Sequence, residues 1–409
     1  MQTKTGFVRA ASFEELKEKG RLAVRAGGKS LALFYEGGEV YAVDNRCPHM
    51  GFPLDRGSIH DGILTCHWHH ARFDLESGGT FDQFADDASV FATEVRDGEI
   101  WIDLSPRGDW REYRRKRLLD GLERSISLVM AKAVISLLDG GEDPAEPFRD
   151  GLLFGVRYRR GGWGQGLTMH TCMMNLIPNL APHDRPRALY HGLAAVARDS
   201  DGMPPRFKLE PLPETSADAA TLKRWLRRFV EVRDAEGAER CIVSAVRGGA
   251  SGAGLADMLF SAATDHRYID IGHPLDFTNK ALEALDAAGW EHAEEVLASL
   301  ARGYARADRM EESNSWRNPV DLIELLKSTF DELPAALTDG DGKKSTERNL
   351  RAELSPILLG EDPREIADVL LGALREGVSM VELAGAVSYA AALRIARFPT
   401  SNEFGDWDT

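Results

Sequence analysis

The 409-residue sequence has little cysteine and no long hydrophobic run. With only four cysteines, it is not a disulfide-rich secreted scaffold. No run of about eighteen apolar residues is present, so we predict no membrane-spanning helix and no membrane partner. The first residues lead into strand-like sequence and do not resemble a signal peptide. These absences predict a cytoplasmic protein.

Basic residues are also scarce. Lys and Arg number 50 against 65 Asp and Glu, for a formal net charge of −15. Because nucleic-acid binding needs a basic surface, this balance argues against such a partner. The one concentrated basic run, Arg111 to Arg117, is predicted to be a solvated face, with steering of an acidic partner as the alternative. The length and an ordinary hydrophobic content of 43% suit about two or three domains.

Two of the four cysteines belong to a metal-binding pattern. Cys47-Pro48-His49 is followed, after a gap of sixteen residues, by Cys66-His67-Trp68-His69. Each half pairs one sulfur with one imidazole nitrogen. Tetrahedral Cys2His2 zinc is one interpretation. The other is a [2Fe-2S] centre with two Cys on one iron and two His on the other. The remaining cysteines, Cys172 and Cys241, lie in apolar stretches and are predicted to be buried thiols without a disulfide.

The flanking residues favour the iron-sulfur interpretation. The first loop continues as Met50-Gly51 and the second as His70-Ala71-Arg72-Phe73-Asp74. In spacing, in the aromatic residue between ligands and in the Phe-Asp after the second loop, residues 1–105 resemble the Rieske ferredoxin family. The resemblance implies an antiparallel β-sandwich domain. It also implies a [2Fe-2S] cluster held by Cys47, His49, Cys66 and His69.

The resemblance further implies a low reduction potential. High-potential respiratory Rieske proteins carry a serine and a tyrosine that bond to cluster sulfur, at positions held here by Ala71 and Phe73. They also carry an extra cysteine in each loop, where this sequence has Phe52 or its neighbours and Trp68. We therefore expect a potential below about +100 mV, within a family range of roughly −150 to +300 mV.

Local patterns predict short strands for residues 6–105. Residues 31–35 and 40–43 alternate around a Gly-Gly turn and predict a β-hairpin. Residues 90–95, expected at a sheet edge, and 100–104 flank an Asp-Gly turn and predict a second hairpin. A helix is expected over residues 12–17, with Ser12 as N-cap and Glu15 completing a capping box.

The pattern becomes helical at Leu118, so we predict an α+β multidomain protein with a linker over 106–117 and an all-α domain over 118–409. Gly141-Glu142-Asp143-Pro144 recurs as Gly360-Glu361-Asp362-Pro363, which suggests about three repeat units. The alternative is an ordinary helical bundle with glycine-marked loops. The expected helix pairs are 152–159 with 167–176, 242–246 with 255–263, and 369–374 with 380–396.

The third unit looks incomplete. In the first two units a histidine follows the helix pair, His191 and then His273. The third ends at Phe398 to Thr409 without one. We therefore expect a truncated chain, or a repeat completed by a partner chain or by a second copy in a homo-oligomer.

A second redox site is the open question. The acid-x-x-His-x4-5-His motif of Rieske oxygenases is missing, as is any Glu-x-x-His pair. Histidines of the helical region could still form a second metal or cofactor pocket. The catalytic candidates are His170, His191, His266 and His273, with His183 nearby in sequence. The alternative is that each is a hydrogen-bonded core or capping residue.

The predicted function is that of an oxidoreductase. Electrons would come from a reductase or ferredoxin and pass through the cluster, one at a time, to a redox or oxygen-activating site in the helical domain, acting on a small-molecule substrate. The alternative is a ferredoxin-like electron carrier whose helical domain is only a docking scaffold.

Overall fold

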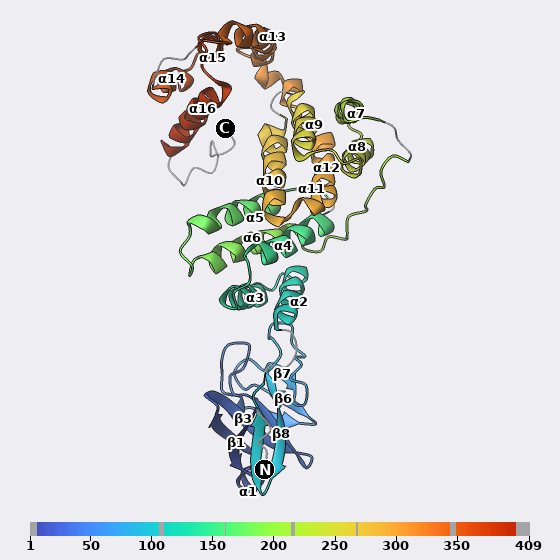
Figure 1. Ribbon diagram of the computed structural model, residues 1–409, viewed down its shortest axis with the longest axis vertical. Helices are drawn as coiled ribbons and strands as arrows, with labels where there is room; N and C mark the ends of the chain where they lie inside the picture. The colour runs from blue at the N-terminus through green and yellow to red at the C-terminus, as the bar shows by residue number, and fades with distance from the viewer. Residues whose placement is uncertain are drawn as a thin grey trace. The chain divides into compact units, whose positions relative to one another are not determined.

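The computed structural model describes residues 6–105, 110–159, 161–213, 217–266, 269–343 and 349–397 (Figure 1). The chain divides into two compact units. The first comprises Met1–Phe207 and Glu283–His292, and the second comprises Lys208–Leu282 and Ala293–Thr409.

The first unit begins with antiparallel sheets. The main sheet has six strands in the order β1-β9-β8-β4-β3-β2, and a smaller one has the order β5-β6-β7. The strands are β1 (Phe7–Ser12), β2 (Arg21–Ala26), β3 (Lys29–Glu36), β4 (Glu39–Asp44), β5 (Ser58–His60), β6 (Ile63–Thr65), β7 (Arg72–Asp74), β8 (Val90–Arg96) and β9 (Glu99–Asp103).

Both predicted hairpins are confirmed, as β3–β4 and β8–β9. The Asp-Gly turn of the second hairpin has φ of 50° at Asp97 and 77° at Gly98, as a two-residue turn with two left-handed positions requires. The expected edge position of β8 is wrong. Because β8 also pairs with β4, through Ala42 with Phe91 and Val43 with Val90, it lies inside the sheet.

The predicted N-terminal helix forms as α1 (Phe13–Lys19), but without its capping box. Ser12 occupies the N-cap position and its side chain makes no capping hydrogen bond. Ser12 is also the last residue of β1, paired with Glu99. The helix is held instead by the fully buried Leu16 and by the Phe13 N–H, which donates to the Gly98 carbonyl at 2.9 Å.

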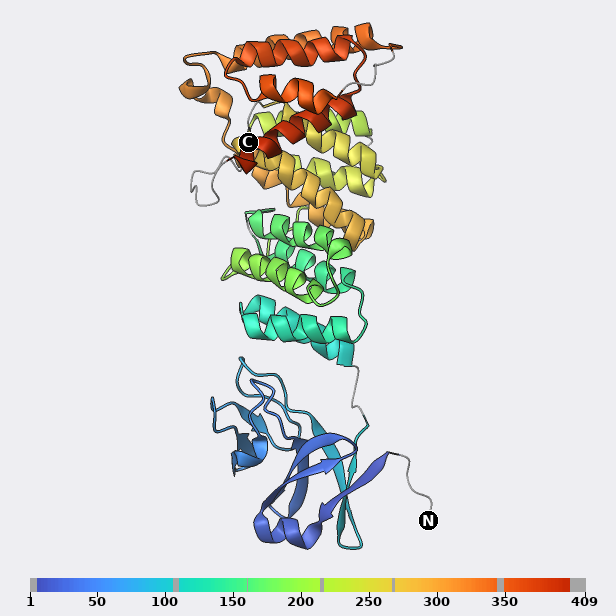
Figure 2. The same ribbon diagram turned by 90° about the vertical axis from the view of Figure 1, so that its left-hand side faces the viewer.

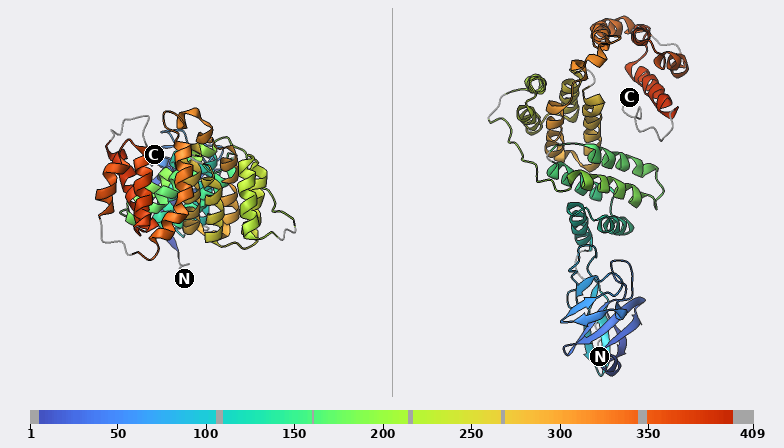
Figure 3. Two further views of the ribbon diagram at one scale, coloured as in Figure 1. Left: turned by 90° about the horizontal axis from the view of Figure 1, so that it is seen from above. Right: turned by 180° about the vertical axis from the view of Figure 1, so that it is seen from behind.

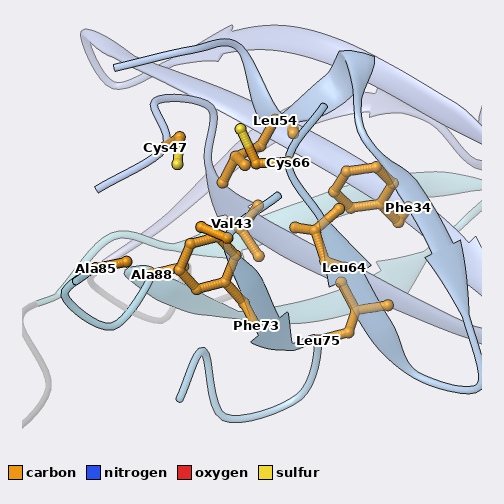
Figure 4. Close-up of a cluster of buried hydrophobic side chains, with 12 residues drawn as sticks. Phe34, Val43, Cys47, Leu54, Leu64, Cys66, Phe73, Leu75, Ala85 and Ala88 are labelled. Atoms are coloured by element: carbon orange, nitrogen blue, oxygen red, sulfur yellow. The ribbon is translucent and has the colours of Figure 1, made fainter. Parts of the chain in front are cut away.

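Strand β3 supplies two separate cores because its side chains alternate between the faces of the sheet. Leu31 and Leu33 pack with Leu16 and Ile102. Ala32 and Phe34 point the other way, into a cluster that includes Leu54, Leu64 and Phe73 together with Cys47 and Cys66 (Figure 4). The two motif cysteines are therefore part of a hydrophobic core.

Five helices complete the description of this unit up to Ser200. They are α2 (Trp110–Glu123), α3 (Ser127–Asp139), α4 (Ala145–Tyr158), α5 (Gln165–Leu176) and α6 (Arg185–Ser200). Helices α2 and α3 lie side by side (Figure 2), and α4, α5 and α6 pack on one another. Gly121 permits the close approach of α2 to α3, because a Cβ there would meet the Met130 side chain at 2.8 Å.

The second unit is also helical where the structure describes it. Its helices are α7 (Ala219–Glu231), α8 (Ala235–Arg247), α9 (Gly252–Thr264), α10 (His273–Ala288, which extends into the first unit's segment), α11 (Ala293–Ala298), α12 (Ala301–Arg306), α13 (Leu322–Gly340), α14 (Leu350–Leu358), α15 (Pro363–Arg375) and α16 (Met380–Ala396). Helices α7 and α8 lie side by side (Figure 3), and α13 to α16 share a core that includes Leu354, Leu371, Leu374 and Leu383. The predicted all-α character is confirmed for the described residues.

All three predicted helix pairs exist, as α4 with α5, α8 with α9, and α15 with α16. Both copies of the Gly-Glu-Asp-Pro motif precede a helix in the same way. Asp143 accepts from the Ala145 N–H and Asp362 from the Arg364 N–H, each at 2.9 Å. The three-unit repeat stays a prediction, and Phe398 to Thr409 lie outside the described residues. Within the described ranges, no helix is long and apolar enough to cross a membrane.

Candidate metal centre

Two short loops carry the four candidate ligands. The first follows β4, and in it the Cys47 N–H donates to the Phe52 carbonyl at 2.8 Å and the Gly51 N–H to the Cys47 carbonyl at 2.8 Å. The second follows β6, where the Cys66 N–H donates to the Ala71 carbonyl at 2.9 Å. These backbone bonds fold each loop back on its own cysteine, so each candidate pair is held by a compact turn.

The two thiols lie in the core. Cys47 is 3% exposed and Cys66 is 1% exposed. Burial, with a contribution from the neighbouring Cys66, raises the pKa of the Cys47 thiol to about 11, although backbone N–H groups of His49 and Met50 bond to its sulfur and lower it. Without a cation the Cys47 sulfur would be a neutral thiol. Donors already aimed at the Cys47 sulfur suit a thiolate bound to metal.

The rings of the two candidate histidines, one from each loop, lie edge to face. The ring centroids of His49 and His69 lie 4.8 Å apart at an interplanar angle of 83°. The Nδ1 atom of His49 is buried and has no hydrogen-bond partner. Burial lowers the pKa of His49, as do the charges of His69 and Lys132, and this favours the neutral imidazole, the form that binds a metal. A buried, unpartnered ring nitrogen therefore fits a metal ligand.

The low reduction potential stays a prediction, and the side chains on which it depends lie as follows. Ala71 and Phe73 are fully buried and offer no hydroxyl. Trp68 is 52% exposed, and its ring lies 4.6 Å from that of His69. His67 is at the surface, where its Nε2 hydrogen-bonds Ser58 Oγ at 3.0 Å. His70 is exposed as well, with a φ of 59°, so both histidines that flank His69 in the second loop lie at the surface.

Helix α2 is bonded to the loop of residues 84–87, and this loop contacts the first candidate histidine, His49. The Phe84 ring lies 4.9 Å from that of His49. Asp86, only 4% exposed, accepts from Arg114 Nη1 at 3.0 Å and from Arg117 Nε at 3.1 Å. Arg117 also donates to the Ala85 carbonyl at 2.9 Å. The loop beside His49 is thus fixed to α2 by a buried ion pair.

The basic run is therefore not the solvated face that its composition predicts. It lies on α2, and besides the two arginines paired with Asp86, Arg115 bonds the Asp150 carboxylate of α4 at 2.6 Å and Arg111 pairs with Glu142 at 3.0 Å. Carboxylates distant in sequence neutralise the run, which the local sequence could not reveal.

Helix α3 reaches the other loop directly. The Lys132 ammonium donates to the carbonyl oxygens of Pro48 and His49. Burial lowers the pKa of Lys132, while the charges of Asp86 and Cys47 raise it. No sequence motif singles out Lys132, Phe84 or Asp86. Only the neighbouring basic run hinted that α2 has a partner.

The helical histidines of the first unit are not brought together. His170 on α5 is fully buried, and its Nε2 donates to the Phe148 carbonyl at 2.9 Å. Burial lowers its pKa to about 4, and its Nδ1 has no partner. His191 on α6 is exposed and lies against Tyr190, with ring centroids 5.5 Å apart. His183 is exposed near Asp184.

In the second unit, His266 and His273 have separate surroundings. The Nδ1 of His266 lies 2.8 Å from Glu311 and its Nε2 lies 3.2 Å from Glu231. His273, at the start of α10, stacks on Phe277 with centroids 5.3 Å apart. Across the residues that the structure describes, the two cluster loops included, no three or more His, Cys, Asp or Glu side chains are gathered closely enough to hold a metal ion. The ligand set Cys47, His49, Cys66 and His69 therefore rests on the loop motifs and on the unpartnered Nδ1 of His49. Cys172 and Cys241 form no disulfide, and Cys172 is only partly buried, unlike the prediction.

Comparison with known families decides the nature of the N-terminal region. Residues 6–91 match the family model described as Rieske [2Fe-2S] domain. The chain belongs to the Rieske family through this domain. The Rieske domain implies a [2Fe-2S] cluster, and the chain therefore has a redox role.

Three curated relatives illustrate the match to the Rieske domain. The 3-phenylpropionate/cinnamic acid dioxygenase ferredoxin subunit of Shigella flexneri is 37% identical over 76 residues, 18% of this chain and 72% of the relative. The naphthalene 1,2-dioxygenase system ferredoxin component of Pseudomonas putida is 28% identical over 100 residues, 24% of this chain and 96% of the relative.

Human apoptosis-inducing factor 3 is 23% identical over 189 residues, 46% of this chain. The match spans only 28% of the length of that relative. The helices after the Rieske domain accordingly have to be interpreted from their own residues.

Proposed function

We propose that this chain is an electron-transfer oxidoreductase whose [2Fe-2S] cluster is held by Cys47 and Cys66 on one iron and by His49 and His69 on the other. The observation that carries the proposal is a buried His49 Nδ1 without a partner, two residues after the core-buried Cys47 thiol. The cluster would accept and release one electron at a time.

Residues around the proposed cluster would set its reduction potential. The N–H groups of His49 and Met50 bond to the Cys47 sulfur, which stabilises negative charge there. Ala71 and Phe73 add no hydroxyl donor. We therefore place the potential below about +100 mV, in the lower part of the Rieske range. A measured value above that limit would contradict this assignment.

The electron donor in this proposal is a reductase or a second ferredoxin. Two of the relatives are named as ferredoxin components of dioxygenase systems, and such a component works between other redox proteins. His69 and Trp68 lie exposed beside one another, which gives such a partner access to one histidine of the proposed cluster.

The favoured role is that of a carrier, with the helical region as scaffold. Three candidate histidines of that region have ordinary structural surroundings: a tyrosine ring for His191, two carboxylates for His266 and a phenylalanine ring for His273. His170 bonds a carbonyl through Nε2 and has a buried Nδ1 without a partner, but no group of ligand side chains surrounds it among the described residues. The second candidate is an oxidoreductase with its own acceptor site among the helices. The contact of Lys132 on α3 with the His49 loop favours it, because an electron leaving on that side meets the helices of the first unit.

Visible and electron paramagnetic resonance (EPR) spectroscopy with metal quantitation, on one anaerobic sample, tests the proposal. We expect two irons per chain, visible absorption and a signal on one-electron reduction. Zinc without visible absorption would refute it. A third metal would favour the second candidate, an oxidoreductase with its own acceptor site, over the carrier. Loss of turnover in His191→Ala or His273→Ala with the cluster intact would do the same.

A further inference from the structure

The loop that carries His49 is held from two sides by helices outside the Rieske fold. On one side, Phe84 packs against His49, and the residues after it are tied to α2 through Asp86, Arg114 and Arg117. On the other side, Lys132 of α3 donates to the backbone of the His49 loop itself. Helices α2 and α3 pack on each other, so both contacts come from the same pair of helices.

The contacts made by α2 and by α3 differ in whether a counter-charge is present. Asp86 accepts from both Arg114 and Arg117, so the α2 contact contains its own counter-charge. The Lys132 ammonium is bonded to two neutral carbonyl oxygens. Among the described residues, no carboxylate lies within ion-pair distance of it. Its side chain is partly buried. A partly buried charge of this kind acts over a longer range than an exposed one.

Building on the ligand set proposed above, we propose that Lys132 is a positioning residue of the cluster, which fixes the His49 loop and raises the reduction potential through its positive charge. Reduction adds one electron and hence one negative charge to the cluster. A cation near a candidate ligand stabilises that reduced state relative to the oxidised one. Through Lys132, helices α2 and α3 would thus partly offset the lower reduction potential that results from the absence of hydroxyl donors at Ala71 and Phe73.

An anchoring role alone does not account for this arrangement. The buried ion pair of Asp86 with two arginines already ties α2 to the Rieske domain. A neutral donor would also satisfy the carbonyls of Pro48 and His49 without the desolvation of a charge. The charge is therefore the property to vary.

Potentiometric titration followed by EPR, on the full chain, tests the inference. Lys132→Gln keeps an N–H donor for the carbonyls and removes the charge. We expect its reduction equilibrium constant to fall about tenfold, which for one electron is a midpoint shift of about 59 mV to more negative values. Lys132→Met should shift the potential in the same direction. Lys132→Arg should retain the wild-type potential.

Lys116→Met is the matched control, because Lys116 is exposed on α2. We expect it to change the potential much less than the loss of the Lys132 charge. Histidine nitrogen couplings in the reduced-state spectrum should be the same in wild type and Lys132→Gln, which separates an electrostatic effect from a disturbed ligand.

The outcomes are distinguishable from those of the proposed function. A wild-type protein without a [2Fe-2S] signal would refute the ligand set itself. A normal cluster with equal potentials in wild type and Lys132→Gln would overturn only the role of Lys132. If the Met variant fails to retain a cluster, the Gln and Arg variants decide, and a negative shift in both of these would show that bond geometry, not charge, is what Lys132 supplies.

Discussion

The cluster loops of the Rieske domain and the histidines of the helical region contain the same kinds of residue and differ in how they are placed. In the Rieske domain, two short loops after β4 and β6 carry two buried thiols and two imidazoles, and the His49 and His69 ring centroids lie 4.8 Å apart. In the helices, His170 is buried alone and His191 is exposed.

The difference teaches that ligand spacing within a turn specifies a site, whereas histidines on separate helices do not. A Cys-x-His or Cys-x-x-His pair is placed by a few backbone hydrogen bonds, such as those of Cys47 with Phe52 and Cys66 with Ala71. Histidines on separate helices depend on packing across the bundle, which local sequence does not encode.

Replacing one core thiol is the most direct way to break the comparison. We expect Cys66→Ser to abolish the visible absorption and EPR signal and to lower the iron content to background, because one iron loses a soft ligand. Cys172→Ser on α5 should keep the full signal. An intact cluster in Cys66→Ser would show that this thiol is not a ligand.

The tie between the Rieske domain and α2 should have the next largest effect. Asp86→Ala leaves Arg114 partly buried without its carboxylate, while Arg117 keeps its pair with Asp120. We therefore expect a loss of about 3 kcal/mol in the free energy of unfolding, at the low end of the range for a broken buried ion pair. Urea denaturation followed by circular dichroism measures it. The control is Asp331→Ala, at an exposed position inside α13 where alanine suits the backbone. Equal losses in the two variants would contradict a structural role for the Asp86 ion pairs.

His170 sharpens the comparison through pH. Its pKa is about 4 in the fold, below the ordinary value of about 6.5, so the unfolded chain binds the extra proton between these values. Above about pH 6.5, protonation of His170 does not affect the free energy of unfolding. Below that pH, the free energy of unfolding falls by about 1.4 kcal/mol per pH unit down to pH 4. Between pH 6.5 and 5 the loss should be about 2 kcal/mol.

Urea midpoints at several pH values measure this effect. His170→Gln should lose that part of the pH dependence, and His191→Gln, at an exposed position, should retain it. If His170→Gln has the same pH profile as wild type, the buried neutral histidine is not its source.

Two serines at helix starts provide the smallest test. Ser379 accepts from the Glu382 N–H while Glu382 bonds back to the Ser379 N–H, a complete capping box on α16. Ser12 occupies the same position on α1 without a capping bond. We expect Ser379→Ala to cost about 1 kcal/mol and Ser12→Ala close to nothing, by thermal unfolding. Equal effects would mean that the caps are not distinguished by their side-chain bonds.

Much of the Rieske domain could be predicted from the sequence because its signals are local. The hairpins around Gly37-Gly38 and Asp97-Gly98 and the two ligand loops each lie within a few residues. The capping box at Ser12 failed because the β1 strand runs up to that residue, so a correct local pattern met a competing structure.

The surroundings of the cluster could not be predicted. Asp86 lies about thirty residues before its arginine partners, and Lys132 lies 83 residues after His49. Such contacts arise when separate elements pack, and no periodicity or spacing marks them. For the same reason, the sequence suggested a shared pocket for the histidines of α5 and α6, whereas in the structure His170 is buried and His191 is exposed.

Pulsed EPR of the reduced protein, prepared with and without ¹⁵N-histidine, tests the central claim most directly. We expect couplings from two histidine nitrogens that change with the label, and one of the two should disappear or alter in a His69 variant that retains iron. A reduced cluster without histidine nitrogen coupling would contradict the assignment of His49 and His69 as ligands.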